Sequence, residues 1–348
     1  MTDKANNYKF GINSFGDIAL DEKGNPLSDA ASIRQVVDEA TLADKLGIDI
    51  IGLGEHHRAD FAISSPEMVL AAIASKTKNI KLTSAVTVLS SDDPVRVYQR
   101  FATLDAVSNG RAEIIIGRGS FTESYPLFGY DLRDYERLFD EKIELMAELI
   151  KERPVTWSGT MRPGLKDTEV FPKTDTGSLP IYVGVGGTPQ SVVRTARYGF
   201  GMMLAVIGGA PDRFKPYVEL YRQASRDLGH EALPVGLHSP GFIAETDEAA
   251  RQAAWGPYQA FHTKVGRDRG WPPVTRQQYE HEIDHGSLYI GSPETVAQKI
   301  ANAIKVLDVK RFDIVYGLGT AKASDRLRTV ELYGKEVIPR VRQLLEEK

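Results

Sequence analysis

A carboxylate and two adjacent imidazoles, Glu55, His56 and His57, directly follow a short apolar run from Ile48 to Leu53. The run has the near-continuous apolar pattern of a strand covered on both faces, as the strands of a parallel sheet are. In α/β folds the active site lies at the carboxyl ends of such strands. We therefore predict that these three residues carry chemistry, and that other strands end in groups that complement them.

A metal site is one interpretation of the adjacent histidines. In an extended backbone, however, His56 and His57 point in opposite directions, so both cannot readily bind one metal ion. The strands expected at 180–185 and 201–206 end without a ligand, and His238 on a further strand is isolated. The chain has no cysteine, which excludes thiolate ligands, thiol nucleophiles and disulfides. The sequence predicts no metal, and a metal-dependent hydrolase is the less favoured alternative.

Residues suited to a phosphate group follow two other expected strands. They are Arg118, after the strand at 112–116, and Gly186, Gly187, Thr188 and Ser191, after the strand at 180–185. The glycines allow close backbone approach, the hydroxyls can donate, and the helix expected after them directs its N-terminal amides at an anion. Arginine adds a charge-assisted hydrogen bond. The alternative is a tight turn in which the glycines serve geometry alone.

Apolar runs of strand length alternate with helical patterns along the chain, which is the signature of repeated βα units. Strands are expected at 9–15, 48–53, 80–89, 112–116, 180–185, 201–206, 235–244 and 311–316. Helices are expected at about 30–46, 64–77, 95–107, 135–153, 189–198 and 211–228, after Ser292, and at the C-terminus. Eight βα units predict a single α/β domain over 1–348, a TIM (β/α)8 barrel with insertions. A Rossmann-type sheet would place Gly-x-Gly-x-x-Gly after the first strand, but the nearest glycine cluster follows the fifth.

Two stretches interrupt the alternation. Residues 157–179 are rich in Gly, Pro, Thr and Asp and predict a surface excursion with a short hairpin. Residues 246–286 contain helical pieces with many aromatic and charged residues and no strand pattern. We interpret this second stretch as a lid or insertion.

Composition excludes several classes of function. The 348 residues carry a formal net charge of −4, and the Lys and Arg residues are scattered, so a nucleic-acid partner is not expected. No segment approaches the ~20 apolar residues that a membrane span needs, and the start has no apolar signal region. We predict a cytoplasmic protein without a membrane partner.

Taken in order, these motifs resemble the bacterial luciferase-like monooxygenase family. The resemblance runs from the first strand to about Gly209 and resumes more weakly at Gly291-Ser-Pro-Glu-Thr-Val296. It rests on Gly54-Glu55-His56-His57, Ser84-Ala85-Val86-Thr87 with Pro94, Ala102–Arg111, Gly117-Arg118-Gly119 and Val185-Gly-Gly-Thr-Pro189. Each motif is modest by itself, whereas the ordered set at these spacings is specific.

The resemblance implies a TIM barrel that binds reduced FMN, or in some branches the deazaflavin F420, and commonly forms a dimer. By their motifs, the residues that would hold the flavin phosphate are Arg118, Gly187, Thr188 and Ser191. Ala85 and Val86 would flank a non-prolyl cis peptide bond beneath the flavin ring. His56 stands where the family places a histidine near the reactive edge of the flavin, with Glu55 and His57 beside it.

We predict a two-component flavin-dependent monooxygenase that oxidises a small organic substrate with O2. A separate flavin reductase would supply reduced FMN, because the sequence shows no second nucleotide site. FMN is favoured by the Gly-Gly-Thr-Pro loop. F420-dependent hydride transfer and a flavin-binding protein without turnover are the alternatives. The stretch 246–286 matches no motif of the family, is expected to form part of the substrate pocket, and leaves the substrate open.

Overall fold

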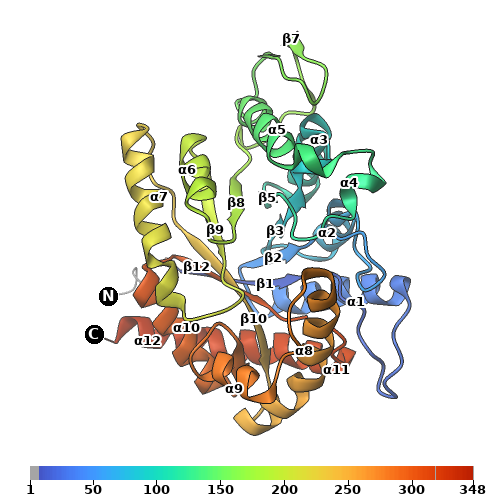
Figure 1. Cartoon of the computed structure of the whole chain (residues 1–348), viewed down its shortest axis with the longest axis vertical. Coiled ribbons are helices and arrows are strands. Elements are labelled where there is room, and N and C mark those ends of the chain that lie inside the picture. Colours follow the sequence, from blue (N-terminus) through green and yellow to red (C-terminus); the bar gives the residue numbers. More distant parts are fainter. Residues whose placement is uncertain (1–7, 318, 348) are drawn as a thin grey trace.

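The computed structural model describes residues 8–317 and 319–347, with the backbone alone at 268 and 269. Helices surround a closed barrel of parallel strands (Figure 1). The barrel strands, in their order around it, are β1 (Lys9–Ser14), β2 (Ile50–Leu53), β3 (Lys81–Ser84), β5 (Ala112–Gly117), β8 (Ile181–Val185), β9 (Gly201–Ala205), β10 (Gly236–Ile243) and β12 (Arg311–Val315). Parallel pairing of β12 with β1 closes the ring, with Gly11 opposite Asp313. The predicted TIM barrel is confirmed.

The strand expected at 80–89 is not continuous. It is divided into β3 and the two-residue β4 (Thr87–Val88), which pairs with the end of β5 and leads into the 3-10 helix η2 (Leu89–Ser91). A further strand, β11 (Tyr289–Gly291), pairs with the end of β10 and was not predicted. Three residues are too few to give a periodic signal.

Helices on the outside begin and end at capping signals in the sequence. The Ser28 hydroxyl accepts from the amide of Ala31 at 3.2 Å, and Asn109 ends α3 with a left-handed φ of 57°. The helices of the βα units are α1 (Asp29–Lys45), α2 (Pro66–Lys76), α3 (Pro94–Ser108), α5 (Tyr135–Leu149), α6 (Pro189–Arg197), α7 (Lys215–Asp227) and α10 (Pro293–Leu307). The remaining short helices are α4 (Ser124–Leu127), η3 (Leu132–Asp134) and η4 (Pro211–Phe214). The chain ends in α11 (Ala323–Leu332), the π-helical η5 (Tyr333–Val337) and α12 (Ile338–Glu346).

Charged side chains fill the amino-terminal half of the barrel interior. Arg311 of β12 lies 2.5 Å from Glu113 of β5 and 2.7 Å from Asp313. Because β12 and β5 are not neighbours in the sheet, the first of these ion pairs crosses the barrel. The three charges satisfy one another out of solvent, as buried ion pairs must. Groups that could bind a ligand are therefore left to the opposite, carboxyl ends of the strands, which we call the barrel mouth.

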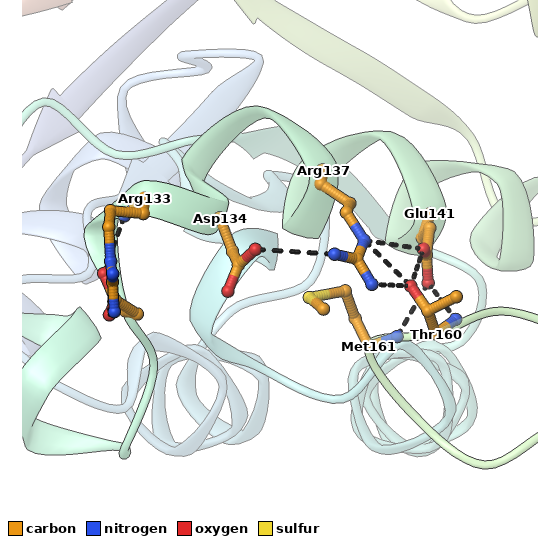
Figure 2. Close-up of polar contacts among 7 residues, drawn as sticks. Arg133, Asp134, Arg137, Glu141, Thr160 and Met161 are labelled. Carbon is orange, nitrogen blue, oxygen red and sulfur yellow. Dashed lines mark hydrogen bonds and ion pairs between the residues drawn. The ribbon is translucent and has the colours of Figure 1, made fainter.

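The excursion after α5 is an antiparallel hairpin of β6 (Val155–Trp157) and β7 (Leu165–Thr168), as expected. It projects beyond α5 at the top of Figure 1. Glu141 of α5 anchors it by accepting from the amides of Thr160 and Met161 at 2.6 and 2.8 Å (Figure 2). Arg137, one turn earlier, donates from Nε to the Thr160 hydroxyl at 2.8 Å. The hairpin is thus held on the outside of the barrel.

The stretch 246–286 is helical and contains no strand, as predicted. Its helices are α8 (Asp247–Arg269) and α9 (Arg276–Asp284), which lie together with α11 at the lower side of Figure 1. They share an apolar cluster with the end of β10, including Phe242, Ala250 and Tyr279. Over the described residues, no helix combines the length and the apolar character that crossing a membrane requires.

Candidate functional site

His56 follows β2, and its ring is packed among three aromatic rings. It stacks on Phe61 with 4.2 Å between ring centroids and meets Phe15 and Phe121 edge-on at 5.4 and 5.3 Å. Its amide donates to the Ile63 carbonyl at 3.0 Å, which fixes the loop. Burial lowers the pKa of His56 to about 3, so the ring is neutral at neutral pH. Among the described residues, its buried Nε2 has no hydrogen-bond partner.

The Glu55 carboxylate connects His57 to β4 through hydrogen bonds. One carboxylate oxygen of Glu55 lies 3.0 Å from Nε2 of His57, and the other accepts from the amide of Val88 at 2.8 Å. The two side chains are 8% and 10% exposed, so solvent screens their interaction weakly. The His57 ring meets Phe128 edge-on at 5.1 Å. His56 and His57 therefore have different surroundings, as expected for adjacent residues of an extended backbone.

His238, which the sequence offered as a further metal ligand, lies inside the barrel. Its Nδ1 is 3.4 Å from the side-chain nitrogen Nδ2 of Asn13, and burial lowers the pKa of His238 to about 4. In residues 8–317 and 319–347, no three His, Asp or Glu side chains are grouped so that they could hold a metal ion.

Small residues form the floor of the barrel mouth. A cis peptide bond joins Ala85 and Val86 between β3 and β4, as the resemblance implies. A Cβ atom on Gly117 or Gly184 would lie 2.8 or 3.0 Å from the Val86 side chain, and one on Gly52 would lie 3.0 Å from the Ala85 Cβ. Carbon atoms normally pack about 3.5–4.0 Å apart, so larger residues in place of these glycines would displace Ala85 or Val86.

The residues predicted to bind a phosphate come together at the ends of β5 and β8, which pair. Nη2 of Arg118 donates to the Ser191 hydroxyl at 3.2 Å, and the Thr188 hydroxyl donates to the same oxygen at 2.9 Å. Gly187 has a φ of +106°, where a side chain would be strained, and Gly186 has open space where a side chain would begin. Ser191 lies in the first turn of α6, where backbone amides and the helix dipole favour anions.

Arg118 also has a carboxylate partner in Glu136 of α5, with which it forms an ion pair. The guanidinium lies 5.2 Å over the ring of Tyr135. Glu136 is 60% exposed and lies 3.1 Å from Arg194 as well. Because Glu136 is exposed, it can return to solvent at small cost when another anion binds Arg118.

This arrangement fits the flavin that the resemblance implies. Arg118, Thr188 and Ser191 would supply donors for a phosphate at one side of the barrel mouth. The small residues of the floor leave room for a flat ring, and the buried Nε2 of His56 lacks a partner that a bound group could supply. Phe121 packs against His56 and must be accommodated by any ring placed beside it.

A cleft of about 570 Å³ opens beside His57. It is lined by His57–Asp60 after β2, by Ser120–Glu123 after β5, and by Lys264 of α8. A smaller cavity shares His57 and Phe121 with it and extends to Glu55 and His56. Sequence reasoning missed the charged residues of the cleft, Arg58, Asp60, Glu123 and Lys264. The sole local signal was that Arg58 and Asp60 lie within three residues of His57.

Comparison with known proteins agrees with this fold. The family model described as luciferase-like monooxygenase matches residues 9–308. Among relatives, N-acetyl-S-alkylcysteine monooxygenase of Bacillus subtilis (strain 168) is 25% identical over 314 residues, which are 87% of this chain and 85% of that protein.

Solved structures share the fold at low sequence identity. Monooxygenase RslO1 from Streptomyces bottropensis has a TM-score of 0.81 at 23% identity, covering 95% of this chain and 99% of that chain. The oxygenating constituent of 3,6-diketocamphane monooxygenase from the CAM plasmid of Pseudomonas putida, in complex with FMN, has a TM-score of 0.77 at 20% identity, covering 96% and 98%. The coenzyme F420-dependent tetrahydromethanopterin reductase from Methanopyrus kandleri has a TM-score of 0.70 at 19% identity, covering 96% and 99%. The family match extends over most of the chain, and the protein belongs to the luciferase-like monooxygenase family.

Proposed function

We propose that this protein is a flavin-dependent monooxygenase that uses reduced FMN and O2 to oxidise a small organic substrate. The observation that carries the proposal is that the hydrogen-bonded Arg118 and Ser191 lie at the same barrel mouth as a buried neutral histidine, with small residues between them. Membership of the luciferase-like family and the FMN-bound diketocamphane monooxygenase, whose fold is similar, support an oxygenase that uses FMN. A separate reductase is proposed as the source of reduced FMN.

The proposed phosphate-binding groups are the loop after β8 and Arg118. In this proposal the Arg118 guanidinium and the hydroxyls of Thr188 and Ser191 donate to the phosphate oxygens, and the two glycines before Thr188, Gly186 and Gly187, allow the backbone to approach them. Ala85 and Val86 would lie beneath the ring. When bound, the reduced flavin supplies the electrons that activate O2.

Proton exchange is the role proposed for His56. Burial keeps the ring neutral, so one of its nitrogens would be available to accept a proton from the substrate or from a bound flavin. The same burial makes the imidazolium costly, so the ring would hold the proton only briefly. Glu55 orients His57 at the rim of the cleft, where it would contact the substrate.

The test is oxygen consumption by the purified protein with photoreduced FMN and candidate substrates, with substrate loss measured in parallel. Absence of FMN binding at micromolar concentration would contradict the proposal. Binding of FMN without substrate loss would indicate a flavin-binding protein without turnover.

The second candidate is F420-dependent hydride transfer, because the F420-dependent reductase from Methanopyrus kandleri has a similar fold. Titration of both cofactors against tryptophan fluorescence separates the two proposals. Tighter binding of F420 than of FMN would favour the second. The predicted homodimer can be checked in the same samples by measuring the mass in solution.

A further inference from the structure

The cleft beside His57 has the size and position of a substrate site. Its volume of about 570 Å³ falls within the roughly 300–1,000 Å³ typical of small-molecule pockets. It shares His57 and Phe121 with the smaller cavity that reaches His56. A molecule in the cleft would therefore lie against His57, Asp60 and Lys264, next to the cavity that His56 lines.

The walls of this cleft are charged. Arg58 and Lys264 contribute cations, Asp60 and Glu123 contribute carboxylates, and Ala59 and Phe121 are the apolar residues among those that line it. An alkyl chain in the cleft would remove water from these charges without offering them hydrogen bonds, which is unfavourable. The cleft is thus suited to a polar ligand and unsuited to a long aliphatic one.

The pairing of these charges indicates the sign of the ligand. Asp60 lies 3.2 Å from Nε of Arg58 and 3.3 Å from Nζ of Lys264, and Glu123 lies 2.5 Å from Nη1 of Arg58. Arg58 is only 12% exposed and its guanidinium lies 4.6 Å over Phe121, so it is held in place. Both carboxylates are already paired with a cation, so a cationic ligand would compete with Arg58 or Lys264 for them.

Lys264 is more exposed to solvent than Arg58. Its side chain is 49% exposed, and Asp60 is its ion-pair partner in the part of the chain that the structure describes. An ammonium group has three N–H donors, so Lys264 can bind a second anion without leaving Asp60. It also lies on α8, whereas the other charges of the cleft lie on the loops after β2 and β5.

We propose that this cleft binds the carboxylate end of a small organic substrate through Lys264, with the reactive end of that substrate directed to His57 and His56. The assignment rests on the proposed function for the identity of the reaction, but the binding itself requires no flavin. Lys264 is then a specificity-determining residue in the stretch that carries no family motif.

Binding of three probes that share a benzyl group tests the proposal on the flavin-free protein. Phenylacetate, phenylacetamide and phenethylamine are added at millimolar concentration, and binding is measured by ligand-observed NMR. Phenylacetate should bind more tightly than the amide by on the order of tenfold, because a charge-assisted bond replaces a neutral one. Lys264→Met should reduce this preference about fivefold or more, whereas Lys264→Arg should retain it. Lys335→Met is the matched control, since Lys335 is 55% exposed and paired with one carboxylate, Glu331, away from the cleft.

Three results would overturn the proposal: no preference for phenylacetate, tighter binding of the amine, or a preference that Lys264→Met leaves unchanged. A separate FMN titration distinguishes the two proposals. If FMN binds and the probes show no preference, the cleft assignment alone is wrong. If the probes behave as expected and FMN does not bind, the proposed function is wrong and the anion site stands.

Discussion

Replacing Arg118 with methionine should remove the selectivity of this protein for FMN over riboflavin. The two ligands share the flavin ring and differ in the phosphate. Arg118 donates to Ser191 at 3.2 Å and is the charged member of the proposed cradle. Methionine keeps an unbranched side chain beside Tyr135 and removes the charge, so binding of the ring should be preserved.

The magnitude follows from the surroundings of Arg118. A hydrogen bond between charged groups contributes about 1.5–3 kcal/mol. The Arg118 side chain is 24% exposed and must exchange Glu136 for the phosphate, so the lower end of that range applies. We expect Arg118→Met to raise the Kd of FMN roughly tenfold and to leave the Kd of riboflavin unchanged. Glu136→Gln removes the competing carboxylate and should tighten FMN binding severalfold.

Flavin fluorescence titration at two ionic strengths measures these effects. Wild-type affinity for FMN should fall with added salt, and Arg118→Met should show a weaker dependence, because salt screens the charge that the variant lacks. Equal weakening of FMN and riboflavin would mean that the substitution damaged the site as a whole. Unchanged FMN binding would show that the phosphate binds elsewhere.

Three other substitutions test the remaining parts of the structure. His56→Phe keeps an aromatic ring within its aromatic surroundings and removes both nitrogens, so FMN binding should persist while turnover falls roughly a hundredfold or more; full activity would refute the proton-exchange role. Burial raises the pKa of Asp17 from 3.8 to about 7. Stability from this group is therefore complete below pH 3.8 and is lost as pH rises to about 7, so the stability of Asp17→Asn relative to wild type should increase over that range by about 1.4 kcal/mol per pH unit at most. Parallel denaturant midpoints at pH 5 and pH 8 that show no such change would contradict this. Arg326 is 1% exposed and lies 3.1 Å from Glu39, which is wholly buried. Arg326→Met should lower the free energy of unfolding by about 3–5 kcal/mol, because it leaves the Glu39 carboxylate without its cation; a loss near zero in the same denaturant assay would show that the pair is not needed.

Local patterns in the sequence were sufficient for the elements of the barrel. The apolar run at 48–53 predicts β2, and the glycines after β8 predict the turn into α6, because strand burial, capping and turn geometry depend on near neighbours. Barrel closure follows from the number of βα units. The position of Arg118 beside Ser191 could be predicted as well, since it requires only that β5 and β8 be neighbours.

Tertiary structure alone decided the division of the expected strand at 80–89 and the pairing of β11. Each depends on which backbone groups of β5 and β10 are close enough to form hydrogen bonds. The periodicity of side chains along the sequence carries no information about these distances. The aromatic surroundings of His56 are decided in the same way, because Phe15, Phe61 and Phe121 come from three different loops.

The charged cleft is the clearest example of a feature that could not be predicted from the sequence. Arg58, Glu123 and Lys264 are far apart in the chain, and each has a local sequence that a solvated surface residue would also have. Their chemistry arises from proximity, which is set by strand register, barrel closure and the path of α8. The sequence by itself therefore determined the barrel and the motifs at its mouth that we propose to bind a phosphate. The tertiary structure decided which charges face the proposed substrate, because electrostatic interactions depend on distance in space and not on separation along the chain.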